Sequence, residues 1–346
     1  MLIALVVLAF VAQAAHAQAG AWNGGVTHVD TVVAPSLREN LIGDPAWREV
    51  TVYLPPGYSK QKSNRYPVVY LLHGFAADHR AFMNGQYQNL NVRISMDSLI
   101  RAGAAKEMIV VMPNARNFFD GSFYANSPVT GKWEDFIVRD LVSHIDRRYR
   151  TIRSRTARAL TGHSMGGYGA LRIGMRHPDT FSAVYALSPC CLASMDASER
   201  RHGWKAAARL TEKSDYARAG FTANLLYAIA TLYSPNTAKP PFFADLPYRL
   251  EGDSLVTVPD VAAKWRAGPL LMAESYMANL RRMSIAFDAG TADGLTDIPV
   301  NVRALDSLLT AHDIPHMAEL YEGDHGNRIR ARLEGKVFPF FSKLLH

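Results

Sequence analysis

The chain has 346 residues, of which 48% are hydrophobic and 20% are charged, and its formal net charge is +7. This length suits one large α/β domain or two small ones, and the absence of an internal repeat argues against solenoids and propellers. Positive charge is densest over residues 147–158, where Tyr149 is the one aromatic residue and no zinc-finger or helix-turn-helix spacing occurs. We therefore expect no nucleic-acid partner.

The first segment of the chain has the composition of a leader. Residues 2–12 form an apolar run, and Ala15-His16-Ala17 fits a small-x-small cleavage site, although no basic residue precedes the run. The run is shorter than the roughly 20 residues of a transmembrane helix. We predict a secretory signal peptide over residues 1–17 and a mature chain, 18–346, that is periplasmic or secreted and has no stable membrane span. The alternative is a buried N-terminal helix.

Apolar runs and helical patterns alternate along the rest of the chain. The expected strands are 47–55, 66–74, 107–113, 155–162, 181–189, 282–290 and 316–323. The expected helices are 91–103, 133–149, one that ends near residue 177, 300–312 and one at the C-terminus. Continuous apolar runs are typical of strands that are buried on both faces. The pattern predicts an α/β fold with a mostly parallel central sheet and helices on both faces.

A segment of about ninety residues, roughly 192–281, interrupts this alternation. It contains three helical pieces, 200–213, 223–233 and 260–282, around an apolar loop at 235–248. Connections in α/β domains are usually much shorter. We expect a helical cap insertion over the site within one domain, and the alternative is extra packing at the edge of the sheet.

The stretch "GHSMGGYG" follows an expected strand and opens an expected helix. Gly162, Ser164 and Gly166 match G-x-S-x-G, the nucleophile elbow, in which a tight turn exposes a serine hydroxyl. The small residues on either side allow the turn to close, and the start of the helix favours developing negative charge. Ser164 is therefore the predicted nucleophile.

A serine nucleophile needs a histidine base and a carboxylate, in the chain order Ser, acid, His for this motif. His325 follows the last expected strand in a glycine-flanked loop, and Asp293 follows the preceding strand. Asp297 is the second choice of acid, because Asp288 lies within a strand and Asp324 suits loop capping.

Two backbone amides should stabilise the oxyanion of the tetrahedral intermediate. One is the amide of Met165, directly after the nucleophile, and the other is the amide of Phe75, in the loop after "YLLHG". Metal-ligand spacing, a phosphate-binding loop and a dinucleotide fingerprint are all missing from the sequence, so we expect no cofactor and no metal.

The motifs "YLLHG", "GHSMGGYGAL", "HPDTFSAVYALS", "GTAD" and "EGDHGN" together resemble the esterase D-like family of α/β-hydrolases. This family includes S-formylglutathione hydrolases, feruloyl and acetylxylan esterases, and secreted mycolyltransferases. The resemblance extends from about residue 47 to the C-terminus outside the cap, and it implies the α/β-hydrolase fold. The stretch "GSFY…KWEDF" is similar to the mycolyltransferase branch, which implies that Tyr124 and Trp133 line the substrate pocket. The alternative is that Trp133 only packs the start of its helix.

These features predict a secreted serine esterase that cleaves a small-molecule or carbohydrate ester through an acyl-enzyme. Two alternatives stay open: an acyltransferase that uses a sugar or lipid acceptor, and a non-catalytic binding module on a hydrolase scaffold. The adjacent Cys190 and Cys191 are interpreted as small buried side chains, because neighbouring cysteines rarely pair. The sequence does not specify the acyl group, the alcohol or the oligomeric state.

Overall fold

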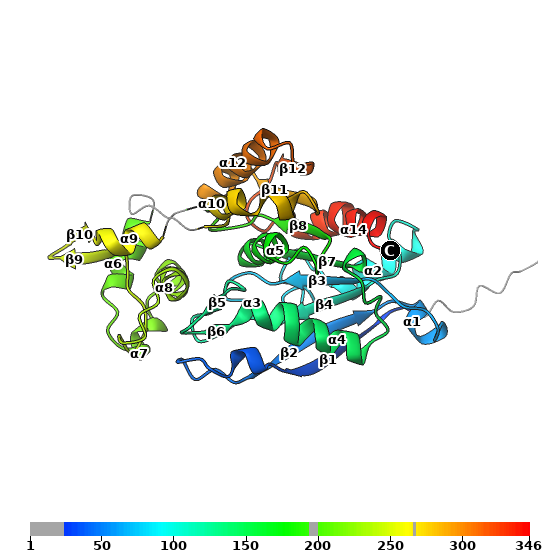
Figure 1. Ribbon diagram of the computed structural model, residues 1–346, viewed down its shortest axis with the longest axis horizontal. Helices are drawn as coiled ribbons and strands as arrows, with labels where there is room; N and C mark the ends of the chain where they lie inside the picture. Colours follow the sequence, from blue (N-terminus) through cyan, green and yellow to red (C-terminus); the bar gives the residue numbers. More distant parts are fainter. Residues whose placement is uncertain (1–23, 194–199, 266–267) are drawn as a thin grey trace, which may run out of the picture.

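The computed structural model describes residues 24–193, 200–265 and 268–346, which are built around an eight-stranded sheet (Figure 1). The strand order is β1-β2-β4-β3-β7-β8-β11-β12. The six strands from β4 to β12 in this order are parallel, whereas β2 pairs antiparallel with both β1 and β4. The strands are β1 (Val26–Val33), β2 (Trp47–Leu54), β3 (Val68–Leu72), β4 (Ile109–Pro113), β7 (Arg158–His163), β8 (Ala183–Leu187), β11 (Ser284–Gly290) and β12 (His316–Tyr321).

Helices cover both faces of this sheet. The principal ones are α2 (Val92–Arg101), α4 (Val142–Arg148), α5 (Met165–Arg176), α12 (Asp297–Ala311) and α14 (Phe338–Leu344). Two short helical stretches, α3 (Trp133–Asp135) and the π-helical η2 (Phe136–Leu141), run directly into α4, so the expected helix 133–149 is present with a π-helical middle. The expected helix at the C-terminus is also made of several stretches, with α13 (Ile329–Arg332) and η5 (Leu333–Val337) before α14.

Strand β3 illustrates why the central strands are apolar at every position. Val68, Tyr70 and Leu72 join the hydrophobic cluster that includes residues of α4, α5 and α12. Val69 and Leu71 point the other way, into the cluster that includes residues of α2 and α14. Because successive side chains of a strand lie on opposite faces, a sheet buried on both sides needs an uninterrupted apolar run.

The expected fold class is present, and every strand expected from the sequence forms. The first strand, β1, was not expected. It lies at the edge of the sheet and most of its residues are exposed, so it lacks the apolar pattern of a buried strand. A second unexpected feature is a small hairpin whose two strands, β5 (Asn126–Ser127) and β6 (Gly131–Lys132), have two residues each.

The segment between β8 and β11, here called the insertion, is mostly helical. Its elements are α6 (Arg201–Ala208), α7 (Lys213–Tyr216), α8 (Phe221–Tyr233), the hairpin β9 (Tyr248–Glu251) and β10 (Ser254–Thr257), α9 (Pro259–Lys264), α10 (Pro269–Ala273), η4 (Glu274–Tyr276) and α11 (Met277–Leu280). The hairpin was not expected, and the third helical piece is divided into several short helices. In Figure 1 the part from α6 to α9 lies at the left, to one side of the central sheet.

The insertion contacts the loops that follow β3 and β4. The ring of Phe75 lies 5.4 Å from that of Phe221 at the start of α8. The ring of Phe118 lies 5.4 Å from that of Tyr216 at the end of α7. The insertion therefore borders the carboxyl ends of parallel strands, which is where sites form in open α/β sheets.

The predicted signal peptide, residues 1–17, lies outside the described residues. Within the described part of the chain, no helix has the length and apolar character needed to cross a bilayer.

Candidate active site

The backbone turns sharply at Ser164, between the end of β7 and the start of α5. Its φ is 57° and its ψ is −116°, in the left-handed half of the map that non-glycine residues rarely occupy. Two hydrogen bonds hold this turn: the Ser164 amide donates to the Leu187 carbonyl at 2.9 Å, and the Cys190 amide donates to the Ser164 carbonyl at 3.3 Å.

The glycines on either side of Ser164 are required by close backbone contacts. A Cβ atom on Gly162 would lie 2.5 Å from the carbonyl carbon of Gly166. A Cβ atom on Gly166 would overlap the carbonyl oxygen of Leu72 in β3. The turn therefore fits between β3 and α5 only without side chains at these two positions.

His325 and Asp293 lie in the loops that follow β12 and β11. Nδ1 of His325 is 2.7 Å from Oδ2 of Asp293, and the other carboxylate oxygen accepts a hydrogen bond from the Leu295 amide at 2.8 Å. The Asp293 side chain is fully buried, whereas that of His325 is 29% exposed. Because Asp293 accepts at Nδ1, the neutral imidazole has its lone pair on Nε2.

His325 also lies next to the serine elbow. The rings of His325 and His163 are 4.6 Å apart, and His163 is the residue directly before Ser164. The structure therefore brings the predicted serine, histidine and carboxylate, which are far apart in the sequence, to one edge of the sheet.

His163 holds the loop of His325 in place, a role that sequence reasoning missed. Its Nε2 is 2.7 Å from the His325 carbonyl oxygen, so Nε2 carries the hydrogen and Nδ1 accepts from the Tyr87 hydroxyl at 3.2 Å. Burial and the nearby charge of His325 lower the pKa of His163 well below its usual value. Gln88 adds a second contact to this loop, since its Nε2 donates to the Gly326 carbonyl at 2.8 Å. The only signal for this role is that His163 stands within the serine motif.

The amides of Phe75 and Met165, the predicted oxyanion donors, lie on two neighbouring segments. A Cβ atom on Gly121 would contact the side chains of both residues, and a Cβ atom on Gly74 would lie 3.6 Å from that of Ser164. Neither amide donates a hydrogen bond to any part of the chain that the structure describes.

His73 fixes the loop that contains Phe75. Its Nε2 accepts from the Ala115 amide at 2.8 Å, so its Nδ1 carries the hydrogen that is donated to the Gly74 carbonyl at 2.8 Å. Burial lowers the pKa of His73 to about 4, so the ring is neutral at neutral pH.

Tyr124 and Trp133 are fully buried, and both make internal hydrogen bonds. The Tyr124 hydroxyl donates to the His73 carbonyl at 2.9 Å, and its ring fills the space next to Gly169. Nε1 of Trp133 donates to the Thr130 carbonyl at 2.8 Å, at the start of its helix. These contacts match the packing alternative for Trp133, and they make Tyr124 a support for the loop after β3.

The other candidate acids have different partners. Asp297 is 2.6 Å from Arg200 of the insertion, and Asp288 contacts Arg332 and the Tyr185 hydroxyl. Asp324 accepts from the amides of Gly326 and Asn327, which is the loop-capping role expected for it. Asp293 is the acid that contacts His325.

Cys190 and Cys191 are both buried, and they form no disulfide. No group of three metal-binding side chains occurs within residues 24–193, 200–265 and 268–346.

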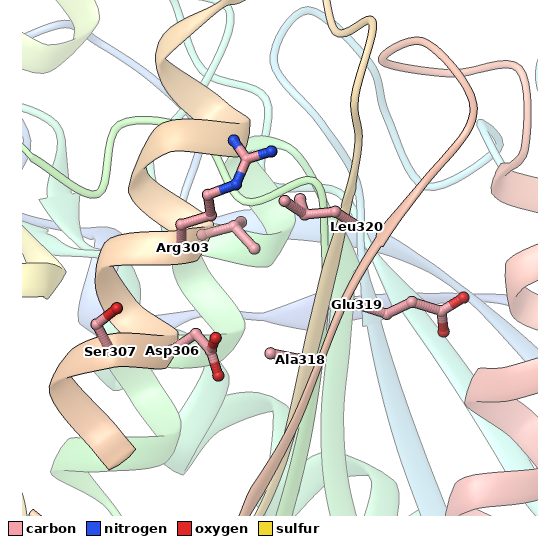
Figure 2. Close-up of a pocket in the computed structure, with 7 residues that line it drawn as sticks. Arg303, Asp306, Ser307, Ala318, Glu319 and Leu320 are labelled. Carbon is pink, nitrogen blue, oxygen red and sulfur yellow. The ribbon is translucent and has the colours of Figure 1, made fainter. Parts of the chain in front are cut away.

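A hollow of about 380 Å³ at the edge of the sheet is separate from this site (Figure 2). Arg303, Asp306 and Ser307 of α12 line one side, and Ala318 and Leu320 of β12 line the other. None of the residues that line it belongs to the elbow or to the loops of His325 and Asp293.

Comparison with known proteins identifies the family. Residues 46–331 match a family model named Esterase and described as "Putative esterase". The chain belongs to this esterase family. This membership confirms the predicted family.

Two curated relatives of this esterase share short matched segments with it. It is 34% identical over 139 residues to an endo-1,4-beta-xylanase/feruloyl esterase of Xylanibacter ruminicola, and the match covers 38% of this chain and 18% of that protein. It is 31% identical over 142 residues to Esterase Rv1288 of Mycobacterium tuberculosis, with 39% of this chain and 27% of that protein covered. The chain therefore matches less than a third of each relative's length.

Solved structures confirm the predicted α/β-hydrolase fold of this esterase. A ferulic acid esterase is 24% identical and superimposes with a TM-score of 0.64 over 93% of this chain and 99% of that one. An S-formylglutathione hydrolase from Agrobacterium tumefaciens is 17% identical, with a TM-score of 0.57 and coverages of 93% and 96%.

The contact between Gly166 and the Leu72 carbonyl predicts that Gly166→Ala destabilises the fold. The added methyl group would force β3 and α5 apart, and we expect the free energy of unfolding, measured by urea denaturation, to fall by about 2 kcal/mol or more. The matched control is Gly335→Ala, at an exposed helical position with no atom within 4 Å of the added Cβ, which should be neutral or slightly stabilising. Equal stabilities for the two variants would contradict this close approach.

Tyr124→Phe should lower the free energy of unfolding by about 1–2 kcal/mol, because it leaves the buried His73 carbonyl without this donor. Tyr70→Phe is the matched control, since the Tyr70 hydroxyl is buried without a hydrogen-bond partner and its removal should cause no loss. Urea denaturation of both variants measures the difference. If Tyr70→Phe proved the more damaging of the two, the assigned hydrogen bond would be wrong.

Proposed function

We propose that the chain is a serine esterase in which Ser164, His325 and Asp293 form the catalytic triad. Oγ of Ser164 attacks the ester carbonyl carbon while Nε2 of His325 takes the serine proton. The intermediate then collapses, and the departing alcohol takes this proton from His325. Water attacks the resulting acyl-enzyme by the same route in reverse, which releases the carboxylic acid and restores Ser164.

The observation that carries this proposal is the 2.7 Å contact between His325 and Asp293 beside the serine elbow. Asp293 is buried and accepts from Nδ1, so it orients the ring with Nε2 as the base and stabilises the imidazolium that forms during attack. The hydrogen bond from His163 to the His325 carbonyl also restricts the loop that carries His325.

The amides of Phe75 and Met165 are the proposed oxyanion donors. Met165 is the first residue of α5, so its N–H adds to the positive end of the helix dipole. A preorganised donor of this kind typically contributes about 100- to 1,000-fold to the rate. The neutral His73 and the Tyr124 hydroxyl support the loop that carries the second amide.

A cluster of phenylalanine rings around Phe75 indicates the kind of ester that this site accepts. The ring of Phe75 contacts those of Phe123, at 6.3 Å, and Phe221, at 5.4 Å, and Phe221 is 53% exposed. Of these rings Phe221 is exposed, Phe75 is half-buried and Phe123 is buried, and an aromatic surface next to the proposed reacting groups favours an apolar or aromatic ester. A relative named feruloyl esterase acts on such a class by name. A panel of acetyl, butyryl, long-chain and feruloyl esters tests this choice.

Export is the second part of the proposal, and it rests on the apolar run and the cleavage motif of residues 1–17. A chain that stays inside the cell, with a measured mass that still includes these residues, would contradict it.

Ser164→Ala should lower kcat for a p-nitrophenyl ester by about 10⁴- to 10⁶-fold, since the nucleophile is lost while the fold is kept. Wild-type protein should also be labelled by a fluorophosphonate, and the variant should not. Ser98→Ala, at an exposed position of α2, is the control and should keep wild-type turnover and labelling. Wild-type turnover by Ser164→Ala would refute the assignment.

A further inference from the structure

A second hollow, here called the basic hollow, lies between α5 and the insertion. Its volume is about 450 Å³. It is lined by Asn126, Arg172, Arg176, Leu232, Tyr233, Lys264, Met272, Ser275 and Tyr276. The two arginines come from α5, whereas all the other lining residues except Asn126 come from α8, α9, α10 and η4 of the insertion.

The basic hollow is distinguished by its charge. Among the residues that the structure describes, three cations line it and no carboxylate does. Four other surface hollows also contain arginine or lysine, but each of them includes at least one carboxylate in its lining. Asp306 and Glu319 line the hollow between α12 and β12, and Asp245 lines one within the insertion. Asp97 lines a hollow beside α2, and Asp140 lines one beside η2.

The two arginines are held in place and keep unused donors. Nε of Arg176 donates to Glu134 and Nη1 donates to the Tyr276 hydroxyl, both at 2.7 Å. Arg172 donates from Nη1 to the sulfur of Met272, a weak acceptor, and its Nε is ion-paired with Oε2 of Glu134 at 3.3 Å without a well-aligned hydrogen bond. Among the described residues, neither guanidinium has an acceptor for Nη2.

The carboxylate of Glu134 contacts both arginines, and its negative charge is shared among three partners. Its Oε1 binds Arg176 and His177, at 2.7 and 2.8 Å, and its Oε2 lies 3.3 Å from Nε of Arg172. These partners lower the pKa of Glu134 to about 2 despite its burial, so it contributes a single negative charge. Asp135 is also near Arg176, but it faces Arg139 at 3.7 Å.

Lys264 adds the third cation from the opposite side. It is exposed at the end of α9 and forms no ion pair with the described residues. Asp245, the carboxylate whose pKa its charge influences, is bound by Lys239 and Asn236. Counted over the described residues, two guanidiniums and an ammonium against Glu134 and the Arg139-paired Asp135 leave the basic hollow with a net positive charge.

We propose that the basic hollow is a binding site for an oxyanion, a phosphate or carboxylate group borne on a body about the size of a sugar. Two arginines at i and i+4 of one helix present forked donors, which match the oxygen atoms of such groups. Tyr233 and Tyr276 supply apolar faces for the attached body, and the volume lies within the range of small-molecule sites. The bound anion would join α5 of the main domain to the insertion.

This site is distinct from the elbow, although the same helix carries both. Arg172 is eight residues after Ser164, about 12 Å along α5. Tyr168 lies between them, and its hydroxyl is 3.1 Å from that of Tyr233 in the wall of the basic hollow. The proposal does not depend on the proposed ester hydrolysis, because neither Arg172 nor Lys264 takes part in it.

Calorimetric titration of the mature protein with inorganic phosphate and with glucuronate, at constant ionic strength, tests the site. We expect saturable binding of at least one anion, and tighter binding of phosphate or of glucuronate identifies the group that the natural ligand bears. Lys264→Met and Arg172→Gln should each weaken this binding by about tenfold or more, since each removes a charged hydrogen-bond donor. Lys62→Met, at an exposed position outside the basic hollow, should leave it unchanged.

Two results would overturn the proposal. One is the absence of saturable binding of either anion to the wild-type protein. The other is binding that Lys264→Met leaves unchanged, a clear result because this exposed lysine has no ion pair with the described residues whose loss could disturb folding.

Discussion

The tight turn at Ser164 is the constraint on which the rest of the site depends. A serine with positive φ is costly by about 1–3 kcal/mol, and it persists only where the surrounding structure holds it. Here the turn is held by hydrogen bonds to Leu187 and from Cys190, and by glycines that let α5 approach the carbonyl of Leu72. The same approach puts the Met165 amide at the start of the helix, beside the serine. The proposed nucleophile and one of the two proposed oxyanion donors are thus fixed by one piece of backbone.

The remaining parts of the site are positioned relative to this turn by side chains that do no chemistry themselves. His163, directly before Ser164, donates to the carbonyl of His325 and so connects the segment of the proposed nucleophile to the loop of the proposed base. Tyr124 and His73 secure the loop that bears the Phe75 amide. Because each contact joins segments that are distant in the sequence, the geometry of the site is a property of the whole sheet edge rather than of one motif.

The parts of the fold that could be predicted from the sequence are those that local pattern determines. Buried parallel strands need continuous apolar runs, so β3, β4 and β7 were all expected near their observed positions. The exposed edge strand β1 has no such pattern, and the hairpin of β9 and β10 follows the expected loop 235–248 in a stretch for which no element was expected. Motif and chain order led to Ser164 and His325, whereas the contacts of Tyr124 depend on tertiary packing that no local pattern encodes.

The most direct measurement is a crystal structure of the mature protein after reaction with an alkyl phosphonate. The account predicts a covalent bond from phosphorus to Oγ of Ser164 and a phosphoryl oxygen within hydrogen-bonding distance of the amides of Phe75 and Met165. His325 should contact the ester oxygen and keep its hydrogen bond to Asp293. An adduct on another residue, or a phosphoryl oxygen that points away from both amides, would contradict it.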